Sequence, residues 1–212
     1  CHNAARMLCQ SLNAWLNSAS FRAIKEKLLE KLMPSDAVRV IIQTENSLLQ
    51  RLPWHQSDLF VRYPKSEIAL SAPAYDEIVA KPLPQRAKIR ILAILGSSVG
   101  IDTQADRVLL ENLPDAEVCF LVEPPRRVLD SQLWNPQGWD ILFFAGHSAS
   151  GANCEFGRIY INQSESLTIS DLKNSLHTAV ENGLKLAIFN SCDGLGLARE
   201  LSSLQIPQVV LM

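Results

Sequence analysis

A histidine and a cysteine each lie two or three residues after the end of an apolar run of strand length. ILFFA is followed by Gly146 and His147, and LAIF is followed by Asn190, Ser191 and Cys192. If the two runs form adjacent parallel strands, their ends lie about 5 Å apart. A neutral imidazole can then take the thiol proton and leave a thiolate, the nucleophilic form of cysteine. The spacing therefore predicts nucleophilic catalysis by His147 and Cys192.

The residues around Cys192 suit this chemistry. Asp193-Gly194-Leu195-Gly196 reads as the opening of a helix, so Cys192 is expected near a helix N-terminus. The positive end of the helix dipole favours a thiolate and lowers the thiol pKa. Main-chain N–H groups at such a turn can also bind an oxyanion. We expect the N–H groups of Cys192 and Ser148 to be the oxyanion donors.

A structural role is the alternative for each of these residues. Cysteine is among the most buried residue types, and a single histidine after a strand is usually a packed or solvated group. We expect Cys119, in the middle of another apolar run, to be a core residue and Cys154 to have no role in the chemistry. The position of His147 and Cys192 on consecutive strands is what favours catalysis for this pair.

Apolar strand-like runs alternate with helical patterns from residue 89 onward. The runs fall at 89–95, 117–122, 140–145, 184–189 and 207–212, and the helical patterns at 102–113, 124–133, 168–182 and 195–204. Continuous apolar strands separated by helices are typical of a parallel sheet covered on both faces. Ligands of such sheets bind at the carboxyl ends of the strands, where His147 and Cys192 are expected.

The first part of the chain does not show this alternation of strands and helices. Residues 1–33 have helical spacing up to Pro34, and short strands are expected at 37–43 and 67–71. We therefore predict an α/β protein of three parts. These are an N-terminal α+β segment at 1–72, a proline-rich linker at 73–88 and an α/β core at 89–212.

Composition excludes several classes of function. The chain of 212 residues has 20 Lys and Arg against 22 Asp and Glu, which does not suit a nucleic-acid-binding protein. No apolar run reaches the roughly 18 residues that a membrane span needs, so no membrane association is expected. The five cysteines are odd in number and widely spaced. We expect neither disulfides nor a metal nor another cofactor, and a reducing cytoplasm as the location.

Two paired motifs and several longer segments resemble the CHAT family, caspase-like domains associated with tetratricopeptide repeats, especially in cyanobacteria. The paired motifs are AGHS and NSCDGLG. The segments are LPWHQSDLFVRYPKSEIALSAP (52–73), WDILFFAGHS (139–148), GRIYIN (157–162), LTISDLKNSL (167–176) and LKLAIFNSCDGLGLARELSSLQIPQVVLM (184–212). The likeness covers most of the chain.

The resemblance implies a caspase-like three-layer fold with a mainly parallel sheet between helices. It also implies a regulated processing endopeptidase that acts on proteins or peptides through the dyad His147 and Cys192. Cys192 follows His147 by 45 residues, near the roughly 50 of caspases. Expected partners besides the substrate are a tetratricopeptide-repeat region or protein and a second copy of the chain. Because the family's sheet has a sixth strand and the chain begins at Cys1, we expect it to be part of a longer protein.

The resemblance also points to substrate-binding residues. Several caspase-like relatives that cleave after Arg or Lys carry an acidic residue two positions before the catalytic cysteine. This chain has Asn190 there, which offers hydrogen bonds without charge, and Asp193 follows shortly after. We expect Asn190 and Asp193 to bind substrate, with a slight preference for a basic residue over a neutral polar one.

Two other functions compete with the peptidase hypothesis. A catalytically silent caspase-like scaffold or interaction module would keep the fold, but would need neither His147 nor Cys192. A flavodoxin-like domain that binds small molecules or nucleotides would use residues 96–100 (GSSVG) as a phosphate loop. That loop lacks the Lys-Ser/Thr ending and the spaced glycines of known phosphate motifs, so we expect a structural turn.

Overall fold

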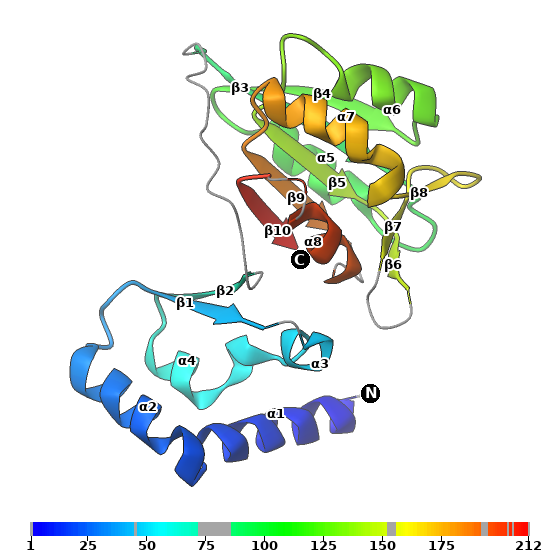
Figure 1. The fold of residues 1–212 in the computed structure, drawn as a ribbon. Helices are drawn as coiled ribbons and strands as arrows, with labels where there is room; N and C mark the ends of the chain where they lie inside the picture. Colours follow the sequence, from blue (N-terminus) through cyan, green and yellow to red (C-terminus); the bar gives the residue numbers. More distant parts are fainter. Residues whose placement is uncertain are drawn as a thin grey trace. The chain divides into compact units, whose positions relative to one another are not determined.

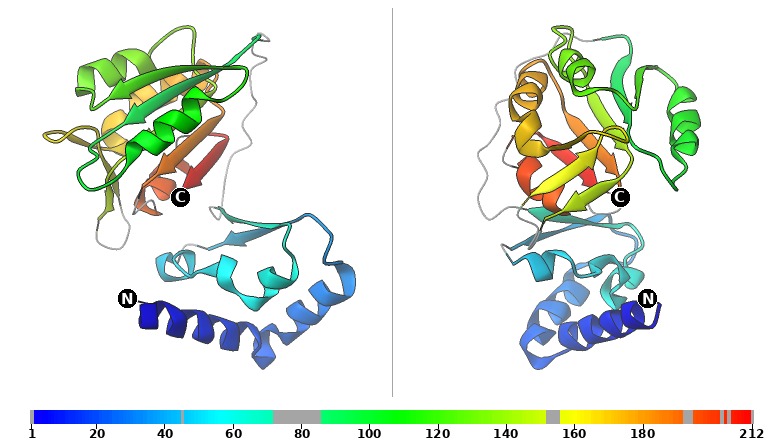
Figure 2. Two further views of the ribbon diagram at one scale, coloured as in Figure 1. Left: turned by 180° about the vertical axis from the view of Figure 1, so that it is seen from behind. Right: turned by 90° about the vertical axis from the view of Figure 1, so that its right-hand side faces the viewer.

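The computed structural model describes residues 2–44, 46–71, 86–151, 156–191, 195–202, 204 and 206–211. The chain divides into two compact units, residues 1–75 and 76–212, and the boundary falls within the range for which we expected a linker. No helix within the described ranges is long and apolar enough to cross a membrane. The units are drawn in Figures 1 and 2.

The N-terminal unit combines helices with a small parallel sheet. Its elements are α1 (His2–Leu16), α2 (Ala19–Lys31), β1 (Val38–Gln43), α3 (Ser47–Gln50), the 3-10 helix η1 (Trp54–Gln56), α4 (Asp58–Arg62) and β2 (Ser66–Ser71). β1 and β2 pair in parallel, with Val38 opposite Ser66 and Gln43 opposite Ser71. Both strands were predicted from the sequence.

The prediction of one helix over residues 1–33 is wrong, because the helix breaks at Asn17 and Ser18. The Asn17 side chain donates to the Asn13 carbonyl, and the Ser18 N–H donates to the Trp15 carbonyl. Short polar side chains of this kind compete with helical main-chain bonds. Ser18 is extended and precedes the first residue of α2. The chain therefore turns between two separate helices.

The second unit is an α/β layer structure with a five-stranded parallel sheet. Its strands are β3 (Ile89–Leu95), β4 (Ala116–Val122), β5 (Ile141–Ala145), β9 (Leu186–Asn190) and β10 (Gln208–Leu211), in the spatial order β10-β9-β5-β3-β4. Its helices are α5 (Thr103–Glu111), α6 (Arg126–Leu133), α7 (Ile169–Glu181) and α8 (Leu195–Ser202). All five strands and four helices were predicted within a few residues. The alternation of buried apolar runs with helical patterns is thus confirmed as a helix-covered parallel sheet.

The helices lie on both faces of the sheet, as Figures 1 and 2 show. On one face, which we call the α5 face, Leu110 of α5 packs with side chains of β3 and β5 such as Ala93 and Phe143. On the other face, α6, α7 and α8 cover a larger core that includes Phe144 and Phe189. The crossover from β3 to β4 runs along the sheet in the direction opposite to the other three. With one crossover handedness, α5 must then lie on the opposite face from the other helices.

Between β5 and α7 the chain forms a small antiparallel sheet that the sequence did not suggest. Its strands are β6 (Ser148–Ser150), β7 (Gly157–Tyr160) and β8 (Ser166–Thr168), in the order β6-β7-β8. The last residue of β8, Thr168, is also the N-cap of α7. Its hydroxyl accepts from the Asp171 N–H, and the Asp171 carboxylate accepts from the Thr168 N–H, which forms a capping box.

Candidate functional site

His147, one of the two residues predicted to be catalytic, lies at the carboxyl edge of the parallel sheet, where β3 and β5 end side by side. From β3 the chain enters α5 on one face, whereas from β5 it leads through the small sheet to α7 on the other. This divergence makes the β3–β5 edge a topological switch point, and ligands of doubly wound sheets bind at such points. His147 follows β5 at this edge, and residues 96–100 follow β3.

His147 is held by main-chain bonds on both sides. Its N–H donates to the Ser97 carbonyl (3.2 Å), and its carbonyl accepts from the Tyr160 N–H (3.0 Å). The Ser97 N–H in turn donates to the Tyr160 carbonyl (2.9 Å). The three bonds form a closed ring between the end of β3, the end of β5 and β7. This ring fixes the backbone of His147 before any side-chain contact is considered.

The imidazole of His147 is also oriented by a main-chain group. Its Nε2 lies 2.7 Å from the Val99 carbonyl oxygen. A carbonyl oxygen only accepts, so Nε2 must carry the proton and donate it. In the neutral ring, Nδ1 then has the lone pair that a general base needs. Val99 was not expected from the sequence, because the contribution comes from a carbonyl that every residue type has.

Glycines allow the strand ends to approach this closely. A Cβ atom on Gly96 would lie 2.4 Å from the Tyr160 carbonyl oxygen and 2.9 Å from Cε2 of Phe144. A Cβ atom on Gly146 would lie 3.0 Å from Cζ of Phe144 and 3.2 Å from Cα of Gly96. Any side chain at Gly96 would therefore push the loop after β3 away from β7 and disturb the ring around His147.

β5 and β9 are adjacent and parallel, which is the condition on which the expected meeting of His147 and Cys192 depended. Their register pairs Ile141 with Leu186 and Ala145 with Asn190, which is a constant offset of 45 residues. The Gly146 N–H also donates to the Asn190 carbonyl at 3.3 Å. The chain after β5 is thus held against the end of β9, the strand that leads to Cys192.

Cys192, Asp193 and Cys154 lie outside the described residues. The residues on either side of Cys192 and Asp193 are described. Ser191 is buried, and its hydroxyl has no hydrogen-bond partner among the residues that the structure describes. Helix α8 begins at Leu195, three positions after Cys192 in the sequence. The start of a helix after Cys192, predicted from the glycines, is therefore confirmed.

Ser148, expected as an oxyanion donor, is the first residue of β6 and pairs with Ile159 of β7. Hydrogen bonds join His147 to Tyr160 and Gly151 to Phe156 across these strands. Bonded and non-bonded pairs alternate in an antiparallel ladder, so the Ser148–Ile159 pair is a non-bonded one. Because Ser148 belongs to a non-bonded pair, its N–H points away from β7.

Asn190, expected to bind substrate, has an acidic partner that the sequence did not reveal. Its side-chain Nδ2 donates to Oδ1 of Asp106 on α5 at 2.8 Å. Asp106 lies four residues before Leu110, which is buried against the sheet, so both side chains lie on the inner side of α5. The i, i+4 spacing from Leu110 is the signal in the sequence that could have pointed to Asp106.

The loop at 96–100 does not have the character of a phosphate site. Several main-chain N–H groups of this loop already donate within the protein. The Gly96 N–H donates to the Ala145 carbonyl and the Ser97 N–H to the Tyr160 carbonyl, and the N–H of Ile101, directly after the loop, donates to the Ser98 carbonyl. A phosphate cradle needs such N–H groups to point at the ligand. The loop instead presents the Val99 carbonyl to His147.

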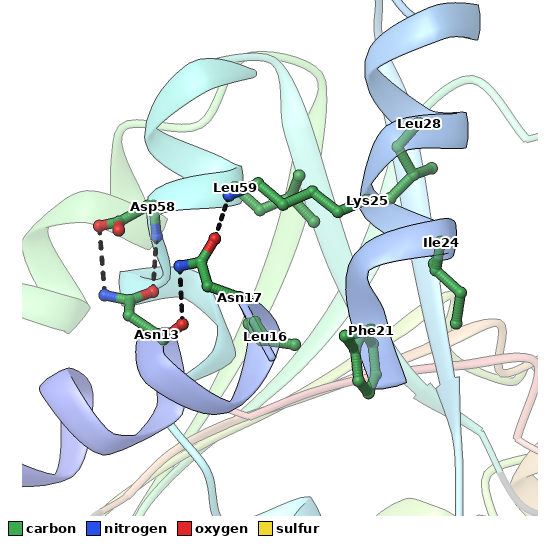
Figure 3. Close-up of a pocket in the computed structure, with 9 residues that line it drawn as sticks. All are labelled: Asn13, Leu16, Asn17, Phe21, Ile24, Lys25, Leu28, Asp58 and Leu59. Carbon is green, nitrogen blue, oxygen red and sulfur yellow. Dashed lines mark hydrogen bonds between the residues drawn. The ribbon is translucent and has the colours of Figure 1, made fainter. Parts of the chain in front are cut away.

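A hollow in the N-terminal unit lies between α1, α2 and α4 (Figure 3). Its apolar lining consists of Leu16, Phe21, Ile24, Leu28 and Leu59. Its polar residues are Asn13, Asn17, Lys25 and Asp58. Asn13 and Asp58 exchange two hydrogen bonds, and Lys25 donates to Asn17. Because these polar groups are hydrogen-bonded to one another, we assign the hollow to packing within the unit.

Comparison with known proteins gives no further guidance. No protein-family model matches the sequence, and no curated protein matches it either.

Proposed function

We propose that the chain is a caspase-like cysteine peptidase of the CHAT type, with His147 as general base and Cys192 as nucleophile. The register of β5 and β9 is the observation that carries the proposal. His147 and Cys192 stand two positions in the sequence beyond Ala145 and Asn190, the last residue pair of the two strands. Their sequence separation of 45 residues equals the offset of the strands.

The hydrogen bond between His147 and Val99 supports the role of a base. With Nε2 donating to the carbonyl oxygen, Nδ1 accepts the proton of the Cys192 thiol. No third side chain is needed, because the carbonyl fixes both the tautomer and the orientation of the ring. A carboxylate serves this purpose in serine proteases.

The reaction then has two halves. The thiolate attacks the carbonyl carbon of the scissile peptide bond, and the oxyanion is bound by main-chain N–H groups, for which we propose Ser148 and Cys192. The C–N bond breaks as the imidazolium returns its proton to the leaving amine, which leaves a thioester. Water attacks the thioester while His147 takes its proton, and the carboxylic acid and the free thiol are released.

A doubly wound domain that binds a small molecule is the second candidate. The strand order β4-β3-β5-β9-β10 is the 2-1-3-4-5 order of flavodoxin-like domains, which favours it. The arrangement of the loop after β3 disfavours it, since several of its N–H groups already donate within the protein. A silent scaffold is disfavoured by the bond that orients His147, which a scaffold would not need.

Hydrolysis of a denatured protein mixture, followed by mass spectrometry of the new termini, tests the proposal. Cys192→Ala and His147→Ala should each abolish cleavage, and the double variant should lose no more than either one, because the two residues act as a unit. Cys119→Ala is the matched control, since this thiol lies within β4 and packs on the core. No cleavage by the wild-type chain, or cleavage retained by Cys192→Ala, would overturn the proposal.

A further inference from the structure

β4 is the outermost strand of the parallel sheet at the end opposite to β10 (Figure 1), and within the described part of the chain no strand pairs with its outer edge. It has seven residues and pairs with β3 over its whole length. Exposed edge strands are usually protected by lysine, proline, a bulge or a very short length. β4 has no lysine, proline or bulge, and its one charged residue, Glu117, pairs with Arg90 of β3. Its edge is therefore suited to pairing with another strand.

The main-chain groups on the outer edge belong to every second residue of β4. The Glu123 N–H, directly after the strand, donates to the Leu95 carbonyl. The Asp115 carbonyl, directly before the strand, accepts from the Ile89 N–H. Successive residues of a strand direct these groups to opposite edges, so the odd-numbered residues face β3 and the even-numbered residues of β4 face outward. The outer edge thus offers a regular series of donors and acceptors to a further strand.

Apolar side chains flank this edge on both faces of the sheet. Val122, at the end of β4, pairs with Leu95 on the α5 face and is 58% exposed. On the other face, Asp130 of α6 accepts a hydrogen bond from Ser175 of α7. Val128 lies two positions before Asp130, on the opposite side of α6, so it faces away from α7 and is exposed. A strand added to β4 would bring apolar surface against both side chains.

A two-fold axis through the middle of β4 would bring opposite charges together on the α5 face. Arg107 of α5 lies over the ring of Phe120 and pairs with Glu111 at 2.8 Å. An axis at Cys119, the central residue of the strand, sets Phe120 opposite Val118 of a second copy. This is a shift of two strand residues, about 6.6 Å, which corresponds to about four residues of helix. Because α5 runs against the direction of the strands, Arg107 of one copy then lies level with Glu111 of the other.

We propose that β4 pairs antiparallel with β4 of a second copy of this chain, about a two-fold axis at Cys119. The parallel sheets of the two copies then join into one continuous sheet. A second copy is the occupant because the register centred on the strand uses its whole length and also sets the charges of α5 against their opposites. The proposal does not depend on the peptidase function.

Charge reversal on α5 tests the proposal with two variants. Glu111→Lys brings cations together at both ends of the interface, and Arg107→Glu brings anions together. Each variant alone should raise the Kd of the dimer on the order of 10-fold, because each contact occurs twice. An equimolar mixture should form a heterodimer close to wild-type affinity in sedimentation velocity, since unlike charges again face each other at both ends. A mixture that associates no better than either variant alone would overturn the proposal.

Two exposed valines on opposite edge strands provide a matched control. Val122 lies on β4 and Val210 on β10, and both project from the α5 face. Val122→Lys should weaken the dimer, whereas Val210→Lys should leave it intact. A dimer that is lost in Val210→Lys and kept in Val122→Lys would place the interface at β10 and overturn the proposal.

Oxidation tests the register. The main-chain groups of Cys119 face β3, so the two Cys119 residues across the axis form a non-bonded pair with Cα atoms about 4.5 Å apart. A disulfide can bridge that distance. Copper phenanthroline should therefore join two chains through Cys119, identified by mass spectrometry, and Cys119→Ala should abolish the link. A chain that stays monomeric, or a dimer that forms no link at Cys119, would overturn the proposal.

Discussion

Gly96→Ala tests whether the close approach of β3 to β7 holds His147 in place. Gly96 follows β3 directly, and its N–H donates to the Ala145 carbonyl at 2.8 Å. An added Cβ atom would lie 2.4 Å from the Tyr160 carbonyl oxygen, where ordinary contacts begin near 3.4 Å. The loop after β3 and the strand β7 must therefore separate by about 1 Å.

The cost of this separation has two parts. Overpacking of a tight site destabilises a protein by about 1–3 kcal/mol. The bond from the Ser97 N–H to the Tyr160 carbonyl would be strained or lost, at about 1 kcal/mol. We therefore expect the free energy of unfolding to fall by about 2–4 kcal/mol. A displacement of about 1 Å at a catalytic group can cost on the order of 100-fold in rate, so peptide cleavage should fall by a similar factor.

Urea denaturation measures the first effect and peptide hydrolysis the second, with Gly100→Ala as the control. Gly100 has a φ of +80° but no atom within 4 Å of an added Cβ, so alanine there meets backbone strain without a collision. We expect it to cost about 1–2 kcal/mol and to leave the ring around His147 in place. The reasoning would be refuted by a Gly96→Ala protein with wild-type stability and wild-type cleavage.

Three further predictions concern stability, each measured by urea denaturation. The bonds from Thr168 hold the pKa of Asp171 below its ordinary value of 3.8, so the ionised group stabilises the fold above that pH and loses this effect as the pH falls through its native pKa. Asp171→Asn should therefore cost about 1 kcal/mol at pH 7 and little at pH 3, and an equal cost at both would contradict this. Ser191→Ala should leave the free energy of unfolding unchanged or raise it by up to about 1 kcal/mol, because the buried hydroxyl has no hydrogen-bond partner within the described part of the chain; a clear loss would show that the hydroxyl is needed. Glu200→Gln should cost about 1–2 kcal/mol and speed hydrogen exchange at the Gly157 N–H, which donates to the carboxylate at 2.6 Å; unchanged exchange would count against it.

The core of the second unit could be predicted because its strands are buried on both faces. Such strands appear as unbroken apolar runs, for example Ile91–Leu95, and the segments between them contain glycine or proline. The alternation of strands and helices predicted the parallel sheet, whereas the adjacency of β5 and β9 was a condition that only the structure could test. The small sheet at 148–168 was missed because two of its strands have three residues, too few for a period to be seen.

The partners of the candidate residues could not be predicted to the same degree. The Val99 carbonyl belongs to the main chain, so no residue type signals its bond to His147. The pairing of Asp106 with Asn190 spans 84 residues and depends on how α5 lies across the sheet. Local patterns predict which residues share a strand or a helix face, whereas contacts of this kind are set by packing.

The break between α1 and α2 could not be predicted from the local sequence pattern either. Asn17 and Ser18 favour turns, yet both also occur within helices when packing requires it. The helical spacing of apolar residues continues across the break and therefore predicted one long helix. The bond from the Asn17 side chain to the Asn13 carbonyl was not visible in that pattern.

The pH dependence of Cys192 alkylation tests the central claim most directly. Wild-type chain and His147→Ala are treated with iodoacetamide between pH 5 and 9, and modification of each cysteine is followed by mass spectrometry. If His147 takes the thiol proton, Cys192 of the wild type reacts near neutral pH far faster than Cys119, and His147→Ala reduces its rate to that of an ordinary thiol with a pKa of about 8.5. A Cys192 rate that is the same in both proteins across this range would contradict the assignment of the two residues as a catalytic pair.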